Sequence, residues 1–506
     1  MKRIRILATS DLHGYIYPNS YIDGKNCKQG VSQLSTLIES LRDENTLLLD
    51  NGDTLEGSPL TFYHYHTHPT EVNPMTSVMH DMHYDYVNVG NHDFNYGEDA
   101  LMMHLQNIGA NCITSNFLFH GKPYGPTYVI REFEDIKVAI IAVTTQYIPH
   151  WETKAHIKHS KFMDAFETLK KNVELVKKLE KPDYIIGMYH GGFERDFETG
   201  YLSEEDTGEN QASKMMNLIP DLDILISGHQ HRTLCGKGDH CVYTQTAANG
   251  VQLACIDIYP ENNTIEPRIL DGEGIGNTEI TKYIQPQEDE CQAWLDQPLG
   301  TTNIDLTITD ENEARLHKSQ VITFINQIQM KVTGADIASC ALFLHATGFP
   351  KNITMRNLLS TYVYPNTLVI KEMSGKVLKE YLEKDAEFWV IKADGTIGVN
   401  PSYDYPKPQH YNYDMLDGIE YTIKVTNPVG SRIVSLTRDG KDIQDDDVFK
   451  VCLNNYRATG GGNYAMIPGC KTVGIDLHSM IELLAEEILK QKVIDFEPVN
   501  NISVIR

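Results

Sequence analysis

Histidine, aspartate and asparagine side chains follow directly after short apolar runs in the first half of the chain. Five of six such runs end in the motifs Asp11-Leu-His13, Asp50-Asn-Gly-Asp53, Gly90-Asn-His-Asp93, His190-Gly-Gly192 and Gly228-His-Gln-His231. Residues i and i+2 of an extended segment face the same side, so Asp11 and His13 could present two ligands to one place. His229 and His231 have the same spacing. Imidazole and carboxylate are common ligands of transition metals, so the pattern predicts a metal site assembled from several loops.

Three other histidines also alternate, at positions 64, 66 and 68. No carboxylate-rich or glycine-rich segment surrounds them. We therefore expect a solvated loop there and leave these residues out of the predicted site.

The elements that would position the five motifs alternate between strands and helices. Strand-like apolar runs cover residues 4–8, 46–49, 86–89, 138–143, 184–188 and 223–226, and helical spacing covers 34–41 and 162–179. This alternation is typical of a layered α/β domain. The carboxyl ends of strands in such sheets open onto a common crevice, which is where ligands bind.

A second unit is expected after an acidic, loop-rich stretch. Helical spacing covers 313–332, and alternating strands follow at 419–425 and 448–453. We predict a catalytic domain over residues 1–284, a linker or hinge over 285–310 and a smaller α+β domain over 311–506.

The composition limits the partners. The 44 basic residues against 69 acidic ones give a formal charge of −25, so nucleic-acid polymers and anionic membranes are not expected to bind. A small anionic substrate is compatible with this charge if bound metal reverses the local field. The chain has no recognisable signal peptide or membrane span, and its nine cysteines are odd in number and scattered. We expect reduced thiols, a cytoplasmic location and no obligate protein partner.

Taken in order, the five motifs resemble those of the binuclear metallophosphoesterase fold. Longer stretches, at residues 50–60, 90–97, 364–368 and 454–462, resemble the bacterial 5′-nucleotidase family, in particular its 2′,3′-cyclic-nucleotide 2′-phosphodiesterase/3′-nucleotidase branch. The resemblance covers nearly the whole chain. It implies a calcineurin-like α/β/β/α sandwich followed by a 5′-nucleotidase-type, nucleoside-binding C-terminal domain.

The resemblance also implies a set of seven metal ligands. Asp11, His13 and His231 would hold one divalent ion, Asn91, His190 and His229 would hold the other, and Asp53 would bridge the two. This ligand set suits Mn²⁺ or Zn²⁺ first, with Fe²⁺ and Co²⁺ as alternatives. Such a pair of ions would grip the phosphate and lower the pKa of a bound water, so that a metal-bound hydroxide attacks phosphorus.

By the same resemblance His92 would stabilise the transition state or protonate the leaving alkoxide. In 5′-nucleotidases of the family an aspartate follows this histidine by three residues, whereas this chain has Asn95. An amide can orient an imidazole but carries no negative charge, so we expect His92 to be a weaker acid–base group. Strained cyclic esters need less help, and we expect Asn95→Asp to raise monoesterase activity relative to cyclic-ester activity.

In the second domain the resemblance implies that Tyr364 and Tyr456 sandwich a nucleobase, with Asn366 at its edge. Stacking tolerates any base, so broad nucleotide acceptance is expected. Many 5′-nucleotidases of the family carry Asn-Gly-Gly-Gly-Ile-Arg in this domain, and the corresponding stretch here, 338–345, has neither the glycines nor the arginine. This difference argues against a pure 5′-nucleotidase.

The predicted function is hydrolysis of 2′,3′-cyclic nucleotides and 3′-nucleotides by a two-metal phosphohydrolase. A 5′-nucleotidase or related nucleotide phosphohydrolase is the enzymatic alternative. A non-catalytic protein that binds nucleotides or metals is the alternative from a different class.

Overall fold

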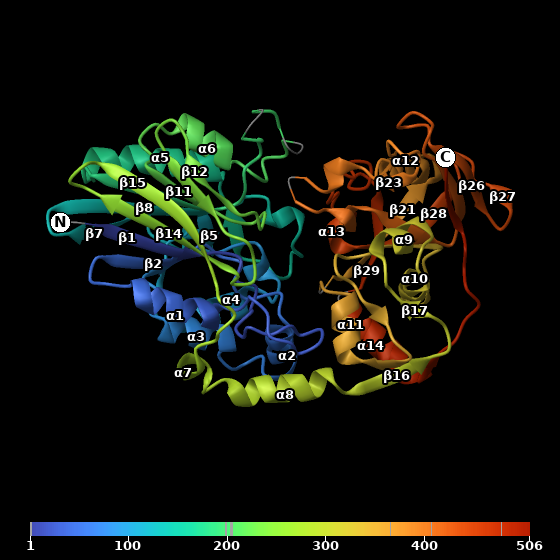
Figure 1. Cartoon of the computed structure of the whole chain (residues 1–506). Coiled ribbons are helices and arrows are strands. Elements are labelled where there is room, and N and C mark those ends of the chain that lie inside the picture. Colours follow the sequence, from blue (N-terminus) through green and yellow to red (C-terminus); the bar gives the residue numbers. More distant parts are fainter. Residues whose placement is uncertain (1–2, 198–199, 203–205, 365, 406, 477) are drawn as a thin grey trace. The chain divides into compact units, whose positions relative to one another are not determined.

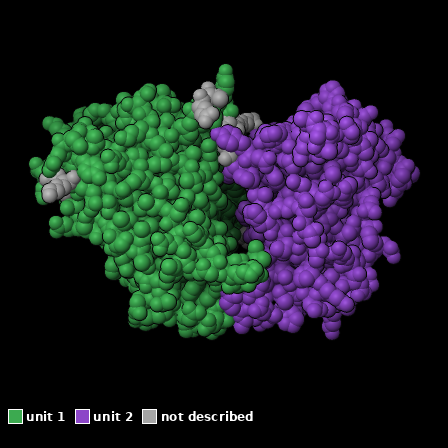
Figure 2. Space-filling view, viewed as in Figure 1, with its two compact units in different colours: residues 1–291 green, residues 292–506 purple. Residues whose placement is uncertain are grey.

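The computed structural model describes residues 3–197, 200–202, 206–364, 366–405, 407–476 and 478–506. The chain forms two compact units, residues 1–291 and 292–506 (Figures 1 and 2). The division falls within helix α8 (Gln285–Leu295). The stretch 285–310 therefore contains regular structure, since strands β16 (Pro298–Thr302) and β17 (Leu306–Thr307) follow this helix.

Unit 1 contains a first six-stranded sheet built around its N-terminal strand. The strand order is β15-β14-β1-β2-β3-β4. Strands β1 to β4 run parallel, while β14 is antiparallel to both β1 and β15. The bounds are β1 (Ile4–Thr9), β2 (Thr46–Asp50), β3 (Tyr86–Val87), β4 (Asn111–Cys112), β14 (Gln252–Tyr259) and β15 (Thr264–Asp271).

A second six-stranded sheet in unit 1 has the order β12-β13-β11-β10-β8-β7. Its four central strands are parallel and its two edge strands are antiparallel to their neighbours. The bounds are β7 (Val129–Phe133), β8 (Ile136–Thr144), β10 (Tyr184–His190), β11 (Ile224–Ser227), β12 (Leu234–Lys237) and β13 (Val242–Gln245).

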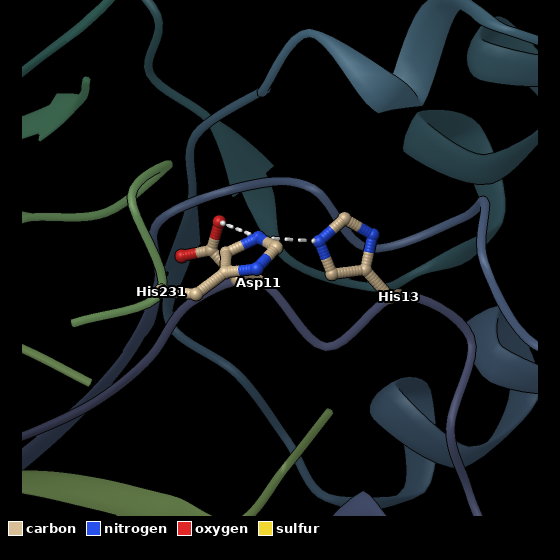
Figure 3. A group of neighbouring side chains, drawn as sticks. All are labelled: Asp11, His13 and His231. Carbon is tan, nitrogen blue, oxygen red and sulfur yellow. Dashed lines mark hydrogen bonds and ion pairs between the residues drawn. The ribbon is translucent and has the colours of Figure 1, made fainter. Parts of the chain in front are cut away.

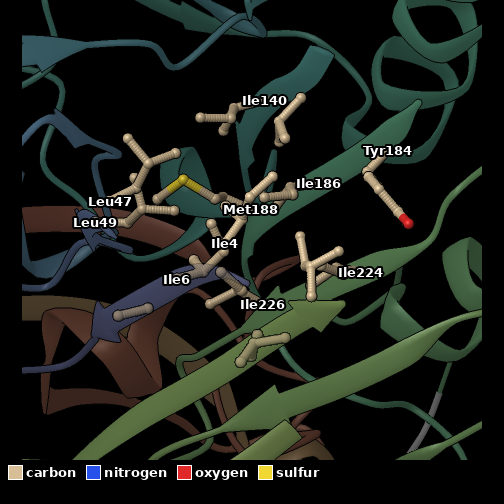
Figure 4. Packing of buried hydrophobic residues seen from close by; sticks show 14 of the residues in the cluster. Ile4, Ile6, Leu47, Leu49, Ile140, Tyr184, Ile186, Met188, Ile224 and Ile226 are labelled. Atoms are coloured by element: carbon tan, nitrogen blue, oxygen red, sulfur yellow. The ribbon is translucent and has the colours of Figure 1, made fainter. Parts of the chain in front are cut away.

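The two sheets share one apolar core. Alternate side chains of both sheets meet in it, such as Ile4 and Ile6 of β1 with Ile186 and Met188 of β10 (Figure 4). Successive side chains of a strand point to opposite faces, so this alternation places the core between the sheets. Full burial of each such side chain stabilises the fold by roughly 1.5–3 kcal/mol.

Helices cover the outer faces of this pair of sheets. Side chains of α5 (Ala165–Leu179) and α6 (Ala212–Leu218) pack on the outward-facing residues of β8 and β10. Helices α1 (Val31–Leu41) and α3 (Pro74–Asp81) lie on the opposite side, beyond β2 (Figure 1). The resulting layers confirm the expected α/β/β/α sandwich.

The expectation of a solvated loop around the three alternating histidines is wrong. They belong to the end of helix α2 (Pro59–Thr67), whose first turn is capped by the Ser58 side chain accepting from the Thr61 backbone N–H. His64 is buried, and its Nε2 donates to the Glu71 carbonyl at 3.1 Å. The Ser-Pro pair at positions 58 and 59 is a helix-start signature, and this local signal outweighs the period-two pattern.

Unit 2 is built on a five-stranded sheet with the order β24-β18-β28-β21-β29. The bounds are β18 (Ile337–Ala341), β21 (Leu368–Ser374), β24 (Asp414–Asp417), β28 (Val448–Asn454) and β29 (Lys471–Asp476). A four-stranded sheet, β27-β26-β25-β31, has the bounds β25 (Glu420–Lys424), β26 (Ile433–Arg438), β27 (Lys441–Asp442) and β31 (Ile502–Ile505). Helices α12 (Gly375–Ala386) and α14 (Met480–Gln491) complete the α+β character of this unit.

The single helix expected over 313–332 is two helices, α9 (Glu311–Leu316) and α10 (Gln320–Thr333). The break lies at Lys318, whose backbone is left-handed with φ 52° and whose buried ammonium group pairs with Asp417. Ser319 then caps α10. Among the residues that the structure describes, no helix combines the length and apolar character needed to cross a membrane.

Candidate metal centre

Loops at the carboxyl ends of strands from both sheets carry the predicted ligands. Asp11 and His13 follow β1, Asp53 follows β2, and Asn91 follows β3 in the first sheet. His190 ends β10, and two further histidines, at positions 229 and 231, follow β11 in the second sheet. The centre thus lies where the same edges of two stacked sheets meet, rather than at the edge of one sheet.

The first group of ligands is Asp11, His13 and His231 (Figure 3). Their ligand atoms all lie within 4.8 Å of one another. The Nε2 atoms of His13 and His231 are 3.0 Å apart, and His231 Nε2 lies 3.5 Å from Asp11 Oδ1. Two imidazole nitrogens and a carboxylate facing one point are suited to hold a divalent cation.

The second group is Asp53, His190 and His229, whose ligand atoms also lie within 4.8 Å of one another. His190 Nε2 is 3.1 Å from Asp53 Oδ2, and both side chains are fully buried. Asn91 is the residue before His92, whose backbone N–H donates to Asp53 Oδ1 at 2.7 Å, so its segment is tied to this group.

Three buried ligand atoms test whether metal ions fit. Asn91 Oδ1 is buried and has no hydrogen-bond partner within the described part of the chain. The buried Asp53 Oδ2 and His190 Nε2 face each other at 3.1 Å but form no hydrogen bond of acceptable geometry there. An unsatisfied buried polar atom costs about 1–3 kcal/mol, and a cation would satisfy all three. The donor set is therefore chemically suited to a metal pair.

Several of the predicted ligands have a strained backbone. Five of the seven predicted ligands have left-handed backbones, namely Asp11, His13, Asp53, His229 and His231, with φ between 49° and 71°. Side-chain-bearing residues rarely adopt this conformation, which costs on the order of 1–3 kcal/mol and is typical of functional sites.

Close packing explains one of the glycines. A Cβ atom on Gly90 would lie 2.2 Å from Asp53 Oδ1 and 2.6 Å from His190 Cε1. Only glycine leaves room for these two ligands to approach each other.

Backbone carbonyls orient two of the imidazoles. His13 Nδ1 donates to the Glu56 carbonyl at 2.7 Å, and His190 Nδ1 donates to the Asn51 carbonyl at 2.8 Å. Each bond directs the other ring nitrogen toward the centre, which is how metal-ligating histidines are usually held. Burial, together with the positive charge of neighbouring imidazoles, lowers the pKa of His13 to about 4, so that it is neutral and able to bind metal at pH 7.

His92 stands beside the ligands, with its ring centroid 5.2 Å from that of His13. Its Nδ1 lies 2.7 Å from Asn95 Oδ1 and 3.1 Å from Glu56 Oε2. Burial would lower its pKa, but the charges of Asp53 and Glu56 raise it to about 10. Beside the neutral amide of Asn95, a carboxylate from another loop therefore lies within reach of His92.

Several residues of the centre were not singled out from the sequence. Asp93 accepts hydrogen bonds from four backbone N–H groups, and Glu209 Oε1 accepts from His229 Nε2 at 2.8 Å. The Trp151 ring stacks on His229 at a centroid distance of 5.4 Å. Asp93 stands within a motif that was recognised, whereas Glu209 and Trp151 lie in loops with no local signal.

The residues expected to bind the nucleobase lie together in unit 2. Strands β21 and β28 pair at Leu368 and Asn454. The segments beyond are joined by two hydrogen bonds: the Asn455 backbone N–H donates to the Thr367 carbonyl, and the Thr367 backbone N–H donates to the Asn455 side-chain Oδ1. Tyr364 and Tyr456 lie on these two adjacent segments.

Asn366 and an aromatic ring complete this end of the sheet. The Asn366 backbone N–H donates to the Tyr364 carbonyl at 2.8 Å, and its Nδ2 lies 3.5 Å from the Tyr362 hydroxyl. Phe343, in the stretch that lacks the glycines and arginine, packs edge-on against Tyr364 at 5.2 Å. The stretch 338–345 therefore presents an apolar ring to Tyr364.

The fold and the two ligand groups define a metal-dependent phosphoesterase. Residues 4–233 match the model of the calcineurin-like phosphoesterases, which use two divalent metal ions, and residues 298–469 match that of the 5′-nucleotidase C-terminal domain. The chain belongs to the family that combines these two domains and is a hydrolase, a nucleotide phosphoesterase.

Known proteins resemble the chain along its whole length. A candidate 5′-nucleotidase from Staphylococcus aureus, solved in complex with α-ketoglutarate, is 31% identical with a TM-score of 0.93, and the match covers 100% of both chains. The 2′,3′-cyclic-nucleotide 2′-phosphodiesterase/3′-nucleotidase of Haemophilus influenzae is 26% identical over 90% of this chain and 80% of its own. The trifunctional nucleotide phosphoesterase YfkN of Bacillus subtilis is 26% identical over 99% of this chain, which spans 39% of that protein.

Proposed function

We propose that the chain hydrolyses 2′,3′-cyclic nucleotides and 3′-nucleotides, with Mn²⁺ or Zn²⁺ as its two ions and Fe²⁺ or Co²⁺ as alternatives. The observation that carries the proposal is the convergence of two candidate ligand groups beside His92. Three relatives named 2′,3′-cyclic-nucleotide 2′-phosphodiesterase/3′-nucleotidase, at 24–26% identity over 90% of this chain, support the substrate class.

Different residues would serve metal binding, proton transfer and base stacking. When bound, two divalent cations would supply Lewis acidity toward the phosphate and activation of a water. Because Nδ1 of His92 is engaged by Asn95 and Glu56, Nε2 is the nitrogen that can exchange a proton with the leaving oxygen. Tyr364 and Tyr456 would stack on the nucleobase, and stacking tolerates any base.

Hydrolysis of 5′-nucleotides is the second candidate. It is favoured by the Staphylococcus aureus structure and by 5′-nucleotidases of Vibrio species at 22% identity. The stretch 338–345 speaks against it, because it offers no arginine for a free phosphate and presents Phe343 instead.

The test compares kcat/KM of the full chain, reconstituted with Mn²⁺, for 2′,3′-cyclic AMP, 3′-AMP and 5′-AMP. We expect the first two to be preferred over 5′-AMP by at least about tenfold, which corresponds to about 1.4 kcal/mol of transition-state binding. Preference for 5′-AMP would establish the second candidate. Nucleotide binding without hydrolysis of any of the three would identify a binding protein and refute both.

A further inference from the structure

Glu56 is a buried carboxylate whose position at His92 no motif assigns. Its Oε2 lies 3.1 Å from His92 Nδ1, and its side chain is 4% exposed. A carboxylate buried to this degree needs a charged or strongly donating partner to offset its desolvation. The imidazole N–H supplies such a partner.

The backbone around Glu56 is held firmly. Its carbonyl accepts from His13 Nδ1 at 2.7 Å, and the preceding residue, Leu55, donates its N–H to Asp93 at 3.0 Å. The next residue is Gly57 with φ 140°, where a Cβ atom would lie 2.7 Å from the Cβ of His13. The carboxylate is thus presented to His92 by a segment tied to the metal centre itself.

Asn95 holds the same nitrogen of His92 from another direction. Asn95 Oδ1 accepts from His92 Nδ1 at 2.7 Å, while Asn95 Nδ2 donates to Glu152 Oε2 at 2.8 Å. Glu152 is anchored in turn by His156 Nδ1 at 2.9 Å and by the Thr153 N–H at 2.7 Å. This chain of bonds determines which end of the amide faces the imidazole, so Asn95 is a neutral, oriented acceptor.

We propose that Glu56 is a positioning residue for His92 that takes over the role of a partner carboxylate, with Asn95 fixing only the direction of the ring. The inference rests on the proposed function. Two acceptors hold Nδ1, and Glu56 is the charged one of the two, so Nε2 is left as the nitrogen that can pass a proton to the leaving oxygen. As the bond between phosphorus and the leaving oxygen breaks, its electron pair stays on that oxygen and takes the Nε2 proton. The attacking water contributes OH to phosphorus and releases its other proton to solvent.

The test uses leaving groups that need a proton to different degrees. In 3′-AMP the leaving group is an alkoxide, whereas p-nitrophenyl phosphate releases a stable phenolate. For Glu56→Gln with Mn²⁺ we expect kcat on 3′-AMP to fall about 10–100-fold, which is part of the roughly 10²–10⁴-fold that general acid–base catalysis contributes, and kcat on p-nitrophenyl phosphate to fall by less than about threefold. KM for both should change little. Glu56→Asp keeps the charge and should lie between the wild type and Glu56→Gln on 3′-AMP.

A matched control is Glu288→Gln, which removes a carboxylate that is 3% exposed and bonded to the Tyr21 hydroxyl, outside the centre. It should leave both rates near those of the wild type. An equal loss on both esters with Glu56→Gln, or no loss on 3′-AMP, overturns the proposal.

A readout without turnover separates this inference from the proposed function. The ¹⁵N shifts of His92, assigned with a His92→Gln variant, report which ring nitrogen is protonated. We expect Nδ1 to carry a proton in both proteins, because Asn95 Oδ1 still accepts from it, and we expect the shifts of Nδ1 and of its proton to differ in Glu56→Gln, because the charged acceptor is gone. If the wild type cleaves no ester but these shifts differ as expected, the proposed function fails and the positioning role stands. Identical shifts in the two proteins overturn the positioning role, whatever the activity.

Discussion

Replacing Asp93 with asparagine tests how the metal centre is held together. The carboxylate is 2% exposed and joins two ligand-bearing loops. One oxygen accepts from the N–H groups of Asp53 at 3.0 Å and Gly90 at 2.8 Å. The other accepts from those of Thr54 at 2.7 Å and Leu55 at 3.0 Å. The substitution therefore acts directly on the two loops that carry the predicted ligands.

The cost follows from this geometry. An amide has one oxygen, so in either orientation two of the four buried N–H groups face an NH₂ group and lose their acceptor. A hydrogen bond to a charged group contributes about 1.5–3 kcal/mol, so Asp93→Asn should cost roughly 3–6 kcal/mol. That is a large part of the 5–15 kcal/mol typical of a domain. Because ligands Asp53 and Asn91 lie on the two loops, metal affinity should also fall by about 10–100-fold.

The assay measures Mn²⁺ affinity by calorimetry and the unfolding of unit 1 by scanning calorimetry. Burial and the charge of Asp53 raise the pKa of Asp93 to about 6, so measurements at pH 8 keep the carboxylate ionised. The control is Asp223→Asn, where the carboxylate accepts from one backbone N–H, that of Ile185 at 2.8 Å. The control should lose about 1–3 kcal/mol and no metal affinity. Equal losses in the two variants, or unchanged Mn²⁺ affinity in Asp93→Asn, would refute the reasoning.

Three further outcomes are expected. Removing metal with a chelator should abolish hydrolysis and lower the melting temperature, because three buried ligand atoms lose their partner. Adding Mn²⁺ should restore both. A melting temperature that chelation does not change would contradict the metal site. Asn95→Asp should lower the melting temperature and should not raise the ratio of monoesterase to cyclic-esterase activity. The reason is that the new carboxylate would face Glu152 at about 2.8 Å and stand near Glu56. A raised ratio would favour the expectation from the sequence that an aspartate at this position strengthens His92. Tyr364→Ala should raise KM for nucleotides about tenfold or more, since stacking contributes about 1–3 kcal/mol per base, and should leave p-nitrophenyl phosphate hydrolysis unchanged. An equal effect on both substrates would argue against base stacking.

The predicted ligands could be found from the sequence because their arrangement is local. A ligand at the end of a strand is placed by the strand and the turn that follows, and the spacing of Asp11 with His13 or His229 with His231 is a property of extended backbone. The order of apolar runs and helices likewise predicted a layered α/β domain, and the resemblance to the metallophosphoesterase fold implied its α/β/β/α layers.

Only the tertiary structure showed which groups surround those ligands. Glu56 meets His92 across 36 residues of chain, and Glu209 meets His229 from a loop with no pattern of its own. The distribution of ligands over two stacked sheets and the burial of His64 in a helix were also absent from the local pattern. Approach between loops depends on how sheets and helices pack, and packing depends on contacts between residues far apart in the chain, which residue spacing does not encode.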